Sequence, residues 1–169
     1  MAANLVLVRI DDRLIHGQVV VGWAKVVMPD FIAVANDAVA DDALQRSLME
    51  LATPAHLGLV IGRVAEIAAA CRRAPLEGKR VLLLFSTPQD LLRAVESGLP
   101  VTRADVGGMR FSQGKRQVLR AVSLDAADES CFRSLLKKGI QIKVRMVPTD
   151  EDADIAGFLL PERNDSLPG

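Results

Sequence analysis

Four short apolar runs along the chain alternate with segments whose apolar residues recur at helical spacing. The runs are LVLVRI at 5–10, FIAVA at 31–35, HLGLVIG at 56–62 and RVLLLF at 80–85. Short runs rich in leucine, isoleucine and valine are typical of parallel strands that are buried on both faces. Because strand and helix signals alternate, the pattern predicts an α/β fold with a parallel sheet and helices on both faces.

Three segments between and after these runs carry helix signals. In DDALQRSLMELA, Leu44, Leu48 and Leu51 share one face, and in RVAEIAAACRR at 63–73 the apolar residues again line up on one side. We expect both faces to cover the sheet. The segment STPQDLLRAVESG at 86–98 begins with a threonine N-cap and a proline and ends in glycine, which predicts a well-delimited helix.

The second half of the chain is less regular. Residues 101–124 hold two expected strands joined through a glycine-containing loop, and a helix is expected from about 126 to 138, ending at Gly139. IQIKVRMV at 140–147 alternates apolar and polar residues, as a half-exposed strand near a sheet edge does. The end of the chain is expected to form a short acidic-capped helix followed by a frayed tail.

Composition narrows the functional classes. The chain has 169 residues, half of them apolar, which suits one domain spanning 1–169. Lysine plus arginine equals aspartate plus glutamate, and no basic tract occurs, so nucleic acid is not an expected partner. No apolar run approaches the ~18 residues of a membrane span, and the start lacks a signal pattern, so we expect no membrane insertion and a cytoplasmic location. The sequence does not indicate an oligomeric state.

The two cysteines and one of the two histidines are expected to be structural. Cys71 and Cys131 are too few and too far apart for a disulfide framework or a zinc site, and both fall on apolar helix faces. His56 stands beside Pro54 at a strand entrance without charged neighbours. Trp23 lies seven residues beyond His16, and core packing is favoured over a role as a ligand platform.

In open α/β sheets, ligands bind outside the carboxyl ends of the strands, so three loops are of interest. They are DDRLIHG at 11–17, STPQD at 86–90 and VGGMRFSQGK at 106–115. The third resembles a P-loop but fails on spacing: its glycines enclose five residues instead of four, and its lysine is followed by arginine. GxGxxG is also absent from the sequence, so a nucleotide-dependent enzyme is disfavoured, and we expect neither a metal site nor a cofactor.

His16 follows the first strand and is the leading candidate for chemistry. An unperturbed histidine titrates at ~6.5, so its neutral ring is a competent nucleophile near neutral pH, and a phosphoryl group is an acceptor that it can attack. Asp11 or Asp12 is expected to accept a hydrogen bond from one ring nitrogen, leaving the attacking nitrogen bare. The alternative is a loop histidine among solvated surface charges.

The neighbours of His16 offer donors for an anion. Arg9 and Arg13 supply planar guanidinium groups that suit phosphate oxygens. Gly17 and Gln18 open an expected helix, whose free amides and dipole favour negative charge. The residues therefore form a complete set for a phosphohistidine.

The sequence RIDDRLIHGQV at 9–19 resembles the active-site signature of the enzyme IIB components of the mannose, fructose and sorbose class of the bacterial phosphoenolpyruvate-dependent sugar phosphotransferase system (PTS). The likeness continues in NDAVADD at 36–42, LLLFSTPQD at 82–90 and VGGMRFSQGKRQV at 106–118. It covers the chain from about residue 4 to 147. Residues 148–169 then form a C-terminal extension that departs from the family.

The resemblance implies a single three-layer α/β/α sandwich with a mostly parallel sheet of about six to seven strands, the first lying between the fourth and fifth. It implies a cytoplasmic phosphocarrier that takes a phosphoryl group from the phosphorylated IIA component and donates it to a sugar during uptake through the IIC and IID membrane components. The phosphorylated atom falls on Nδ1 of His16, with Arg13 and the aspartates 11 and 12 in the same motif.

The implied strand order sets the three loops side by side. Ser86, Thr87 and the amides around Gly107 and Gly108 are then expected to complete an anion pocket. Further residues are given lesser roles: Asn36 and Asp37 as turn and cap residues, and Arg13, Arg110 and Lys115 as a basic rim that steers an acidic partner.

One alternative of another class stays open. A phosphohistidine at position 16 can also serve a regulatory module that senses phosphoryl flux through its binding partner, without transport. The sugar is not readable from this sequence, because its specificity is expected to reside mostly in the membrane component.

Overall fold

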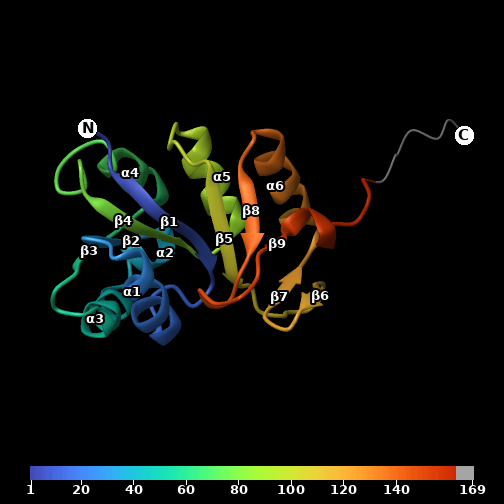
Figure 1. Cartoon of the computed structure of the whole chain (residues 1–169), viewed down its shortest axis with the longest axis horizontal. Helices are drawn as coiled ribbons and strands as arrows, with labels where there is room; N and C mark the ends of the chain where they lie inside the picture. The colour runs from blue at the N-terminus through green and yellow to red at the C-terminus, as the bar shows by residue number, and fades with distance from the viewer. Residues whose placement is uncertain (163–169) are drawn as a thin grey trace, which may run out of the picture.

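The computed structural model describes residues 1–162 and is built on one seven-stranded sheet (Figure 1). β1 (Asn4–Asp11) occupies the position between β4 (Arg80–Phe85) and β5 (Arg103–Gly108). The other strands are β2 (Phe31–Ala35), β3 (Gly58–Gly62), β8 (Gln141–Val144) and β9 (Ala153–Asp154). The order is β3-β2-β4-β1-β5-β8-β9, with every pair parallel except β8 and β9. The expected sheet and the central place of β1 are confirmed.

Helices cover both faces of this sheet. On one face lie α4 (Val64–Ala70), α5 (Pro88–Glu96) and α6 (Ala126–Lys137). The other face carries the π-helix η1 (Gln18–Trp23), α1 (Ala24–Val27), α2 (Asp37–Ala40) and α3 (Ala43–Ala52). Two separate buried clusters fill the two interfaces, so the molecule is the expected three-layer α/β/α sandwich. A small antiparallel hairpin, β6 (Arg116–Leu119) and β7 (Val122–Leu124), precedes α6. Residues 101–124 thus hold three strands instead of the expected two, because the segment after β5 folds back on itself as this hairpin.

Alternation along β1 explains the two clusters. Val8 and Ile10 point into the cluster under α4, α5 and α6, whereas Leu7 points into the cluster under η1. Arg9 and Asp11 fall on the same side as Leu7, because successive side chains of a strand point to opposite faces. The pleat therefore aims two charged side chains at the interior near η1, where both are fully buried.

The expectation for α3 is wrong. Leu44, Leu48 and Leu51 are 69%, 56% and 84% exposed, and Met49 is the helix's buried residue. The sheet surface on that side is already covered by residues of η1 and α1, including Val19 and the ring of the tryptophan that ends η1. By contrast, the apolar face of α4 is buried as predicted.

The ends of the helices follow their sequence signals. Thr87 caps α5, its Oγ1 accepting a hydrogen bond from the amide of Asp90 at 3.2 Å. Gly98 and Gly139 adopt φ values of +93° and +82° just past α5 and α6, a region that favours glycine. Helix α6 ends at Lys137, one residue before its expected end. Both cysteines are buried and free, and burial raises the pKa of the Cys131 thiol to about 12.

The segment after β8 packs on the domain. Strand β9 leads into a short 3₁₀ helix, η2 (Ile155–Phe158), whose first residue is fully buried in the larger core cluster. The Arg116 guanidinium donates to the carbonyl of Phe158 at 2.7 Å. The expected acidic-capped helix is thus a single 3₁₀ turn, and the expected frayed tail, at 163–169, lies outside the described residues. Within residues 1–162, no helix has the length and hydrophobicity needed to cross a bilayer.

Candidate functional site

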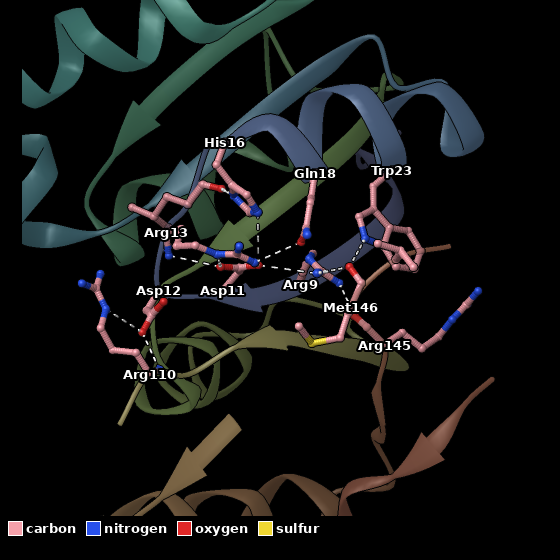
Figure 2. A network of polar contacts seen from close by, with 12 residues as sticks. Arg9, Asp11, Asp12, Arg13, His16, Gln18, Trp23, Arg110, Arg145 and Met146 are labelled. Carbon is pink, nitrogen blue, oxygen red and sulfur yellow. Dashed lines mark hydrogen bonds and ion pairs between the residues drawn. The ribbon is translucent and has the colours of Figure 1, made fainter. Parts of the chain in front are cut away.

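Asp11, the last residue of β1, is the centre around which the following loop is arranged (Figure 2). Its backbone carbonyl accepts a hydrogen bond from the Leu14 amide at 2.9 Å. Leu14 adopts a φ of +54°, a conformation that leucine rarely adopts. This tight turn brings the next residues back over the end of the strand, so that His16 sits above the Asp11 carboxylate with 17% of its side chain exposed.

The carboxylate of Asp11 is bound mainly by Arg13. Arg13 donates from its amide at 3.2 Å and from Nε at 3.0 Å to Oδ1, and from Nη2 at 3.0 Å to Oδ2. The same Nη2 also donates to Oε1 of Gln18 at 3.3 Å. These hydrogen bonds raise the pKa of the Arg13 guanidinium, although partial burial opposes the shift. The Arg13 side chain is 38% exposed while that of Asp11 is fully buried. Of the two charged groups in this ion pair, only the cation can therefore be reached from solvent.

Nδ1 of His16 is not bare, contrary to the expectation that the attacking nitrogen has no hydrogen-bond partner. It lies 2.9 Å from the carbonyl oxygen of Leu14. Nε2 is buried without a hydrogen-bond partner and faces Oδ2 of Asp11 at 3.7 Å, beyond hydrogen-bond reach. The expected pairing of Asp11 with a ring nitrogen is therefore present as a close approach, and Nδ1 is engaged by the Leu14 carbonyl.

Arg9 lies beneath Asp11 and is not available to an external anion. Its side chain is fully buried, and it donates to the carbonyls of Arg145 at 2.8 Å and Met146 at 3.0 Å. Nη2 also lies 3.5 Å from Oδ2 of Asp11. Burial lowers the pKa of the Arg9 guanidinium, and the negative charges of Asp11 and Asp105 oppose that shift. The expectation that Arg9 binds phosphate is wrong, because the strand pleat directs it into the interior.

Trp23 holds this arrangement together, and its burial confirms the prediction of core packing. The ring is 2% exposed, and its Nε1 donates to the carbonyl of Met146 at 3.2 Å. The guanidinium carbons of Arg9 and Arg145 lie 4.9 and 5.0 Å from the ring centroid, as in cation–π contacts. Residues 145 and 146 were missed by the sequence analysis; the available signal was that they follow β8 at the same sheet edge.

Gly107 and Gly108 of β5, whose amides were expected to contact an anion, leave space for the side chains of Arg9 and Asp11. A Cβ at Gly107 would lie 1.8 Å from Nη2 of Arg9, and one at Gly108 would lie 2.9 Å from Oδ1 of Asp11. Only glycine lets these two side chains lie flat against the neighbouring strand. The expected close approach is therefore real, but the approaching groups belong to the protein.

At the end of β4, the hydroxyls of Ser86 and Thr87 serve as structural acceptors. Asn36 donates from Nδ2 to Oγ of Ser86 at 2.8 Å, and Thr87 caps α5. Asn36 also caps α2 through Oδ1, and Asp37 accepts from the Val64 amide at 2.9 Å, a hydrogen bond that lowers the pKa of the Asp37 carboxyl. The structural roles predicted for these two residues are confirmed.

Asp12 points away from His16, toward the loop after β5. Its Oδ2 accepts from the amide of Arg110 at 2.7 Å and from Nε at 3.2 Å. Lys115, another expected rim residue, donates to Asp128 at 3.1 Å. A pocket of about 280 Å³ lies between these side chains, Ser86 and Thr87. Of the two aspartates expected to face the histidine, Asp11 does and Asp12 does not, and the charges of Arg110 and Lys115 are both partly neutralised.

The start of η1 lies next to His16. The carbonyl of His16 accepts from the amides of Val19 and Val20, both at 3.1 Å. In the part of the chain that the structure describes, the amides of Gly17 and Gln18 have no hydrogen-bond acceptor, and both residues are exposed. They remain candidate donors to an anion at the histidine. His56, expected to be structural, is exposed at the end of the α3–β3 connection.

The amino-acid sequence matches a known protein family. Residues 5–167 match the family model of the PTS system sorbose subfamily IIB component, past the expected end of the likeness at 147. The chain is 36% identical over 156 residues to the PTS system fructose-specific EIIB component of Bacillus subtilis, covering 92% of this chain and 96% of that one. It is 42% identical over 144 residues to the PTS system mannose-specific EIIAB component of Escherichia coli K12, covering 85% of this chain and 45% of that longer one.

Solved structures of IIB components share this fold. The IIBSor domain of the sorbose permease from Klebsiella pneumoniae superposes with a TM-score of 0.87 at 35% identity, covering 91% of this chain and 94% of that domain. The N-acetylgalactosamine-specific IIB component 1 from Escherichia coli has a TM-score of 0.83 at 31% identity, covering 89% and 99%. The sequence match, the strand order and the shared architecture show that this chain belongs to the sorbose subfamily of PTS IIB components.

Proposed function

We propose that this IIB component is a phosphocarrier whose His16 accepts a phosphoryl group from a phosphorylated IIA component and donates it to a sugar during uptake through IIC and IID membrane components. The observation that carries the proposal is the position of His16. Its side chain is 17% exposed and lies at the carboxyl end of the central strand, directly over a buried carboxylate and beside an accessible arginine. The proposal places the protein in the cytoplasm, where a IIA donor and the inner face of a transporter are both within reach.

The first transfer begins when the ring of His16 turns away from the Leu14 carbonyl, releases the Nδ1 proton to water and takes up a proton from water on Nε2. The Nδ1 lone pair then attacks the phosphorus of the donor phosphohistidine, and an N–P bond forms. The donor N–P bond breaks, and its electron pair stays on the donor imidazole. Nε2 retains its proton and faces Asp11, which stabilises the ring as it becomes more positive.

Charge neutralisation is the protein's main contribution, because phosphoryl transfer requires in-line placement and electrostatic stabilisation more than covalent chemistry. Arg13 is exposed enough to move one guanidinium edge from Asp11 to the phosphoryl oxygens. The amides of Gly17 and Gln18 supply uncharged donors at the same place. In the second transfer, a sugar hydroxyl oxygen attacks the phosphorus and its proton passes to water, while the N–P bond breaks and its electron pair returns to Nδ1.

The test is labelling with phosphoenolpyruvate through enzyme I, the histidine phosphocarrier and a cognate IIA component. We expect acid-labile, base-stable label on the wild-type chain and on His56→Ala, and none on His16→Ala. His56→Ala is the matched control, since the substitution removes the other histidine of the chain. Label that persists on His16→Ala would refute the assignment.

A further inference from the structure

We propose that Arg9 is a positioning residue that serves as a reserve counter-ion for Asp11: when Arg13 moves to a phosphoryl group on His16, Arg9 keeps the buried Asp11 carboxylate neutralised and in place. This inference rests on the proposed function, since it concerns the state of the site after phosphorylation. It assigns a role to a buried cation that the transfer steps themselves do not use.

The need for a second cation follows from the burial of Asp11. The carboxylate is fully buried, and Arg13 makes every short contact to its two oxygens. A phosphoryl group on His16 competes for the same guanidinium, because arginine binds phosphate oxygens and carboxylates with one geometry. If Arg13 were the only cation, its move would leave an isolated buried carboxylate, which either takes up a proton or loses its position.

Arg9 suits this reserve role because it is fully buried and contacted on several sides. Two carbonyls accept from its guanidinium, the Trp23 ring lies against it, and the missing side chain of Gly107 lets it lie against β5. Its Nη2 stands 3.5 Å from Oδ2 of Asp11, close enough for electrostatic stabilisation but longer than the bonds from Arg13. In the structure, therefore, Arg13 holds Asp11 tightly and Arg9 lies just behind it.

The groups beside the Asp11 carboxylate come from three parts of the chain: β1, the loop that follows it, and β5. Its own strand supplies Arg9, and the following loop supplies Arg13 and His16. From β5, the residue against the carboxylate is Gly108, which carries no charge. After Arg13 has moved, Arg9 and the ring of His16 are the cationic or proton-bearing groups that remain beside this carboxylate.

The direct test uses the wild-type protein and nuclear magnetic resonance. Phosphorylation should shift the Nε resonance of Arg13 and leave that of Arg9 nearly unchanged, while the ¹³C resonance of the Asp11 carboxyl stays where it is in the unphosphorylated protein. An Arg13 resonance that does not move on a chain shown to carry phosphohistidine would overturn the proposal. Absence of any phosphohistidine would instead contradict the proposed function.

Variants sharpen the test. Folded Arg9→Met should accept phosphoryl at least tenfold more slowly than wild type, and the ¹³C resonance of its Asp11 carboxyl should move from the wild-type position only in the phosphorylated form. Arg9→Lys should restore the wild-type Asp11 resonance. A folded Arg9→Met with the wild-type rate and the wild-type Asp11 resonance after phosphorylation contradicts the proposal. If Arg9→Met does not fold, Arg9→Lys and the wild-type resonances decide, since Arg9→Lys must keep the Asp11 resonance unchanged after phosphorylation.

Discussion

The carboxyl ends of β1 and β4 are neighbours in the sheet, and both are followed by polar residues that looked like parts of one anion site. At the end of β1, Arg9 and Arg13 both contact Asp11, and Asp11 faces His16. After β4, Ser86 and Thr87 accept hydrogen bonds that hold α2 and α5 in place. Position at a strand end therefore does not by itself make a residue functional; what its polar atoms bind in the folded chain separates the two ends.

The largest effect is expected from Asp11→Asn at the β1 end. Removing one member of a buried ion pair costs about 3–5 kcal/mol in free energy of unfolding, because the partner charges lose their counter-ion. We also expect phosphoryl transfer to be lost, since the group facing Nε2 is no longer an anion. Chemical denaturation and the labelling assay measure the two effects separately. Near-wild-type transfer by a folded Asp11→Asn chain would show that the carboxylate is scaffold, as at the β4 end.

The second prediction compares two arginines that each bind an aspartate. Arg13→Ala should slow phosphoryl transfer about 10- to 1,000-fold through loss of one anion contact, with the fold intact. Arg93→Ala, which removes an arginine of α5 that is paired with Asp90 and Asp37, should leave the rate unchanged. Single-turnover transfer from a labelled IIA component gives both rates. Equal rates for the two variants would reduce Arg13 to a surface charge.

A smaller effect is expected from Thr87→Ala. Loss of the N-cap hydrogen bond should lower the free energy of unfolding by about 1 kcal/mol, and Thr87→Ser should restore most of it. Transfer rates of both variants should match wild type, as followed by thermal unfolding and the labelling assay. A rate loss comparable to that of Arg13→Ala would place the β4 end in the anion site after all.

The smallest effect is expected from Ser86→Ala, which removes the acceptor of one Asn36 hydrogen bond. We expect a loss of about 0.5–1.5 kcal/mol in free energy of unfolding and no change in transfer. Asn36→Ala in the same background should then add little beyond the loss of its cap on α2. Strict additivity of the two substitutions would show that the observed hydrogen bond contributes nothing in solution.

The sequence was sufficient for the order of strands and helices as far as α5, the position of His16 and the caps of α5, because each depends on local pattern. It predicted two strands within residues 101–124, where the structure has β5, β6 and β7, and it did not predict β9. It failed where tertiary packing decides. The leucines of α3 share a face as predicted, but η1 and α1 already occupy the sheet that this face was expected to cover. Periodicity identifies an apolar face and does not identify what covers it.

In the candidate site, too, features set by local sequence were predicted and features set by tertiary packing were not. The residues from Asp11 to Gln18 are local and were found, whereas the backbone carbonyls of Arg145 and Met146 come from the far end of the chain and carry no side-chain signature. The burial of Arg9 had one available signal, its place between two apolar residues in a strand whose alternate positions face inward. The prediction that both arginines of the motif bind an anion did not take this alternation into account.

The central claim is that His16 carries the phosphoryl group, and on Nδ1. The most direct measurement is ¹⁵N–³¹P correlation on the phosphorylated wild-type chain, labelled with ¹⁵N in histidine. The account predicts coupling from phosphorus to Nδ1 of His16, with Nε2 still protonated and facing Asp11. Coupling to Nε2, or to a ring nitrogen of His56, would contradict it.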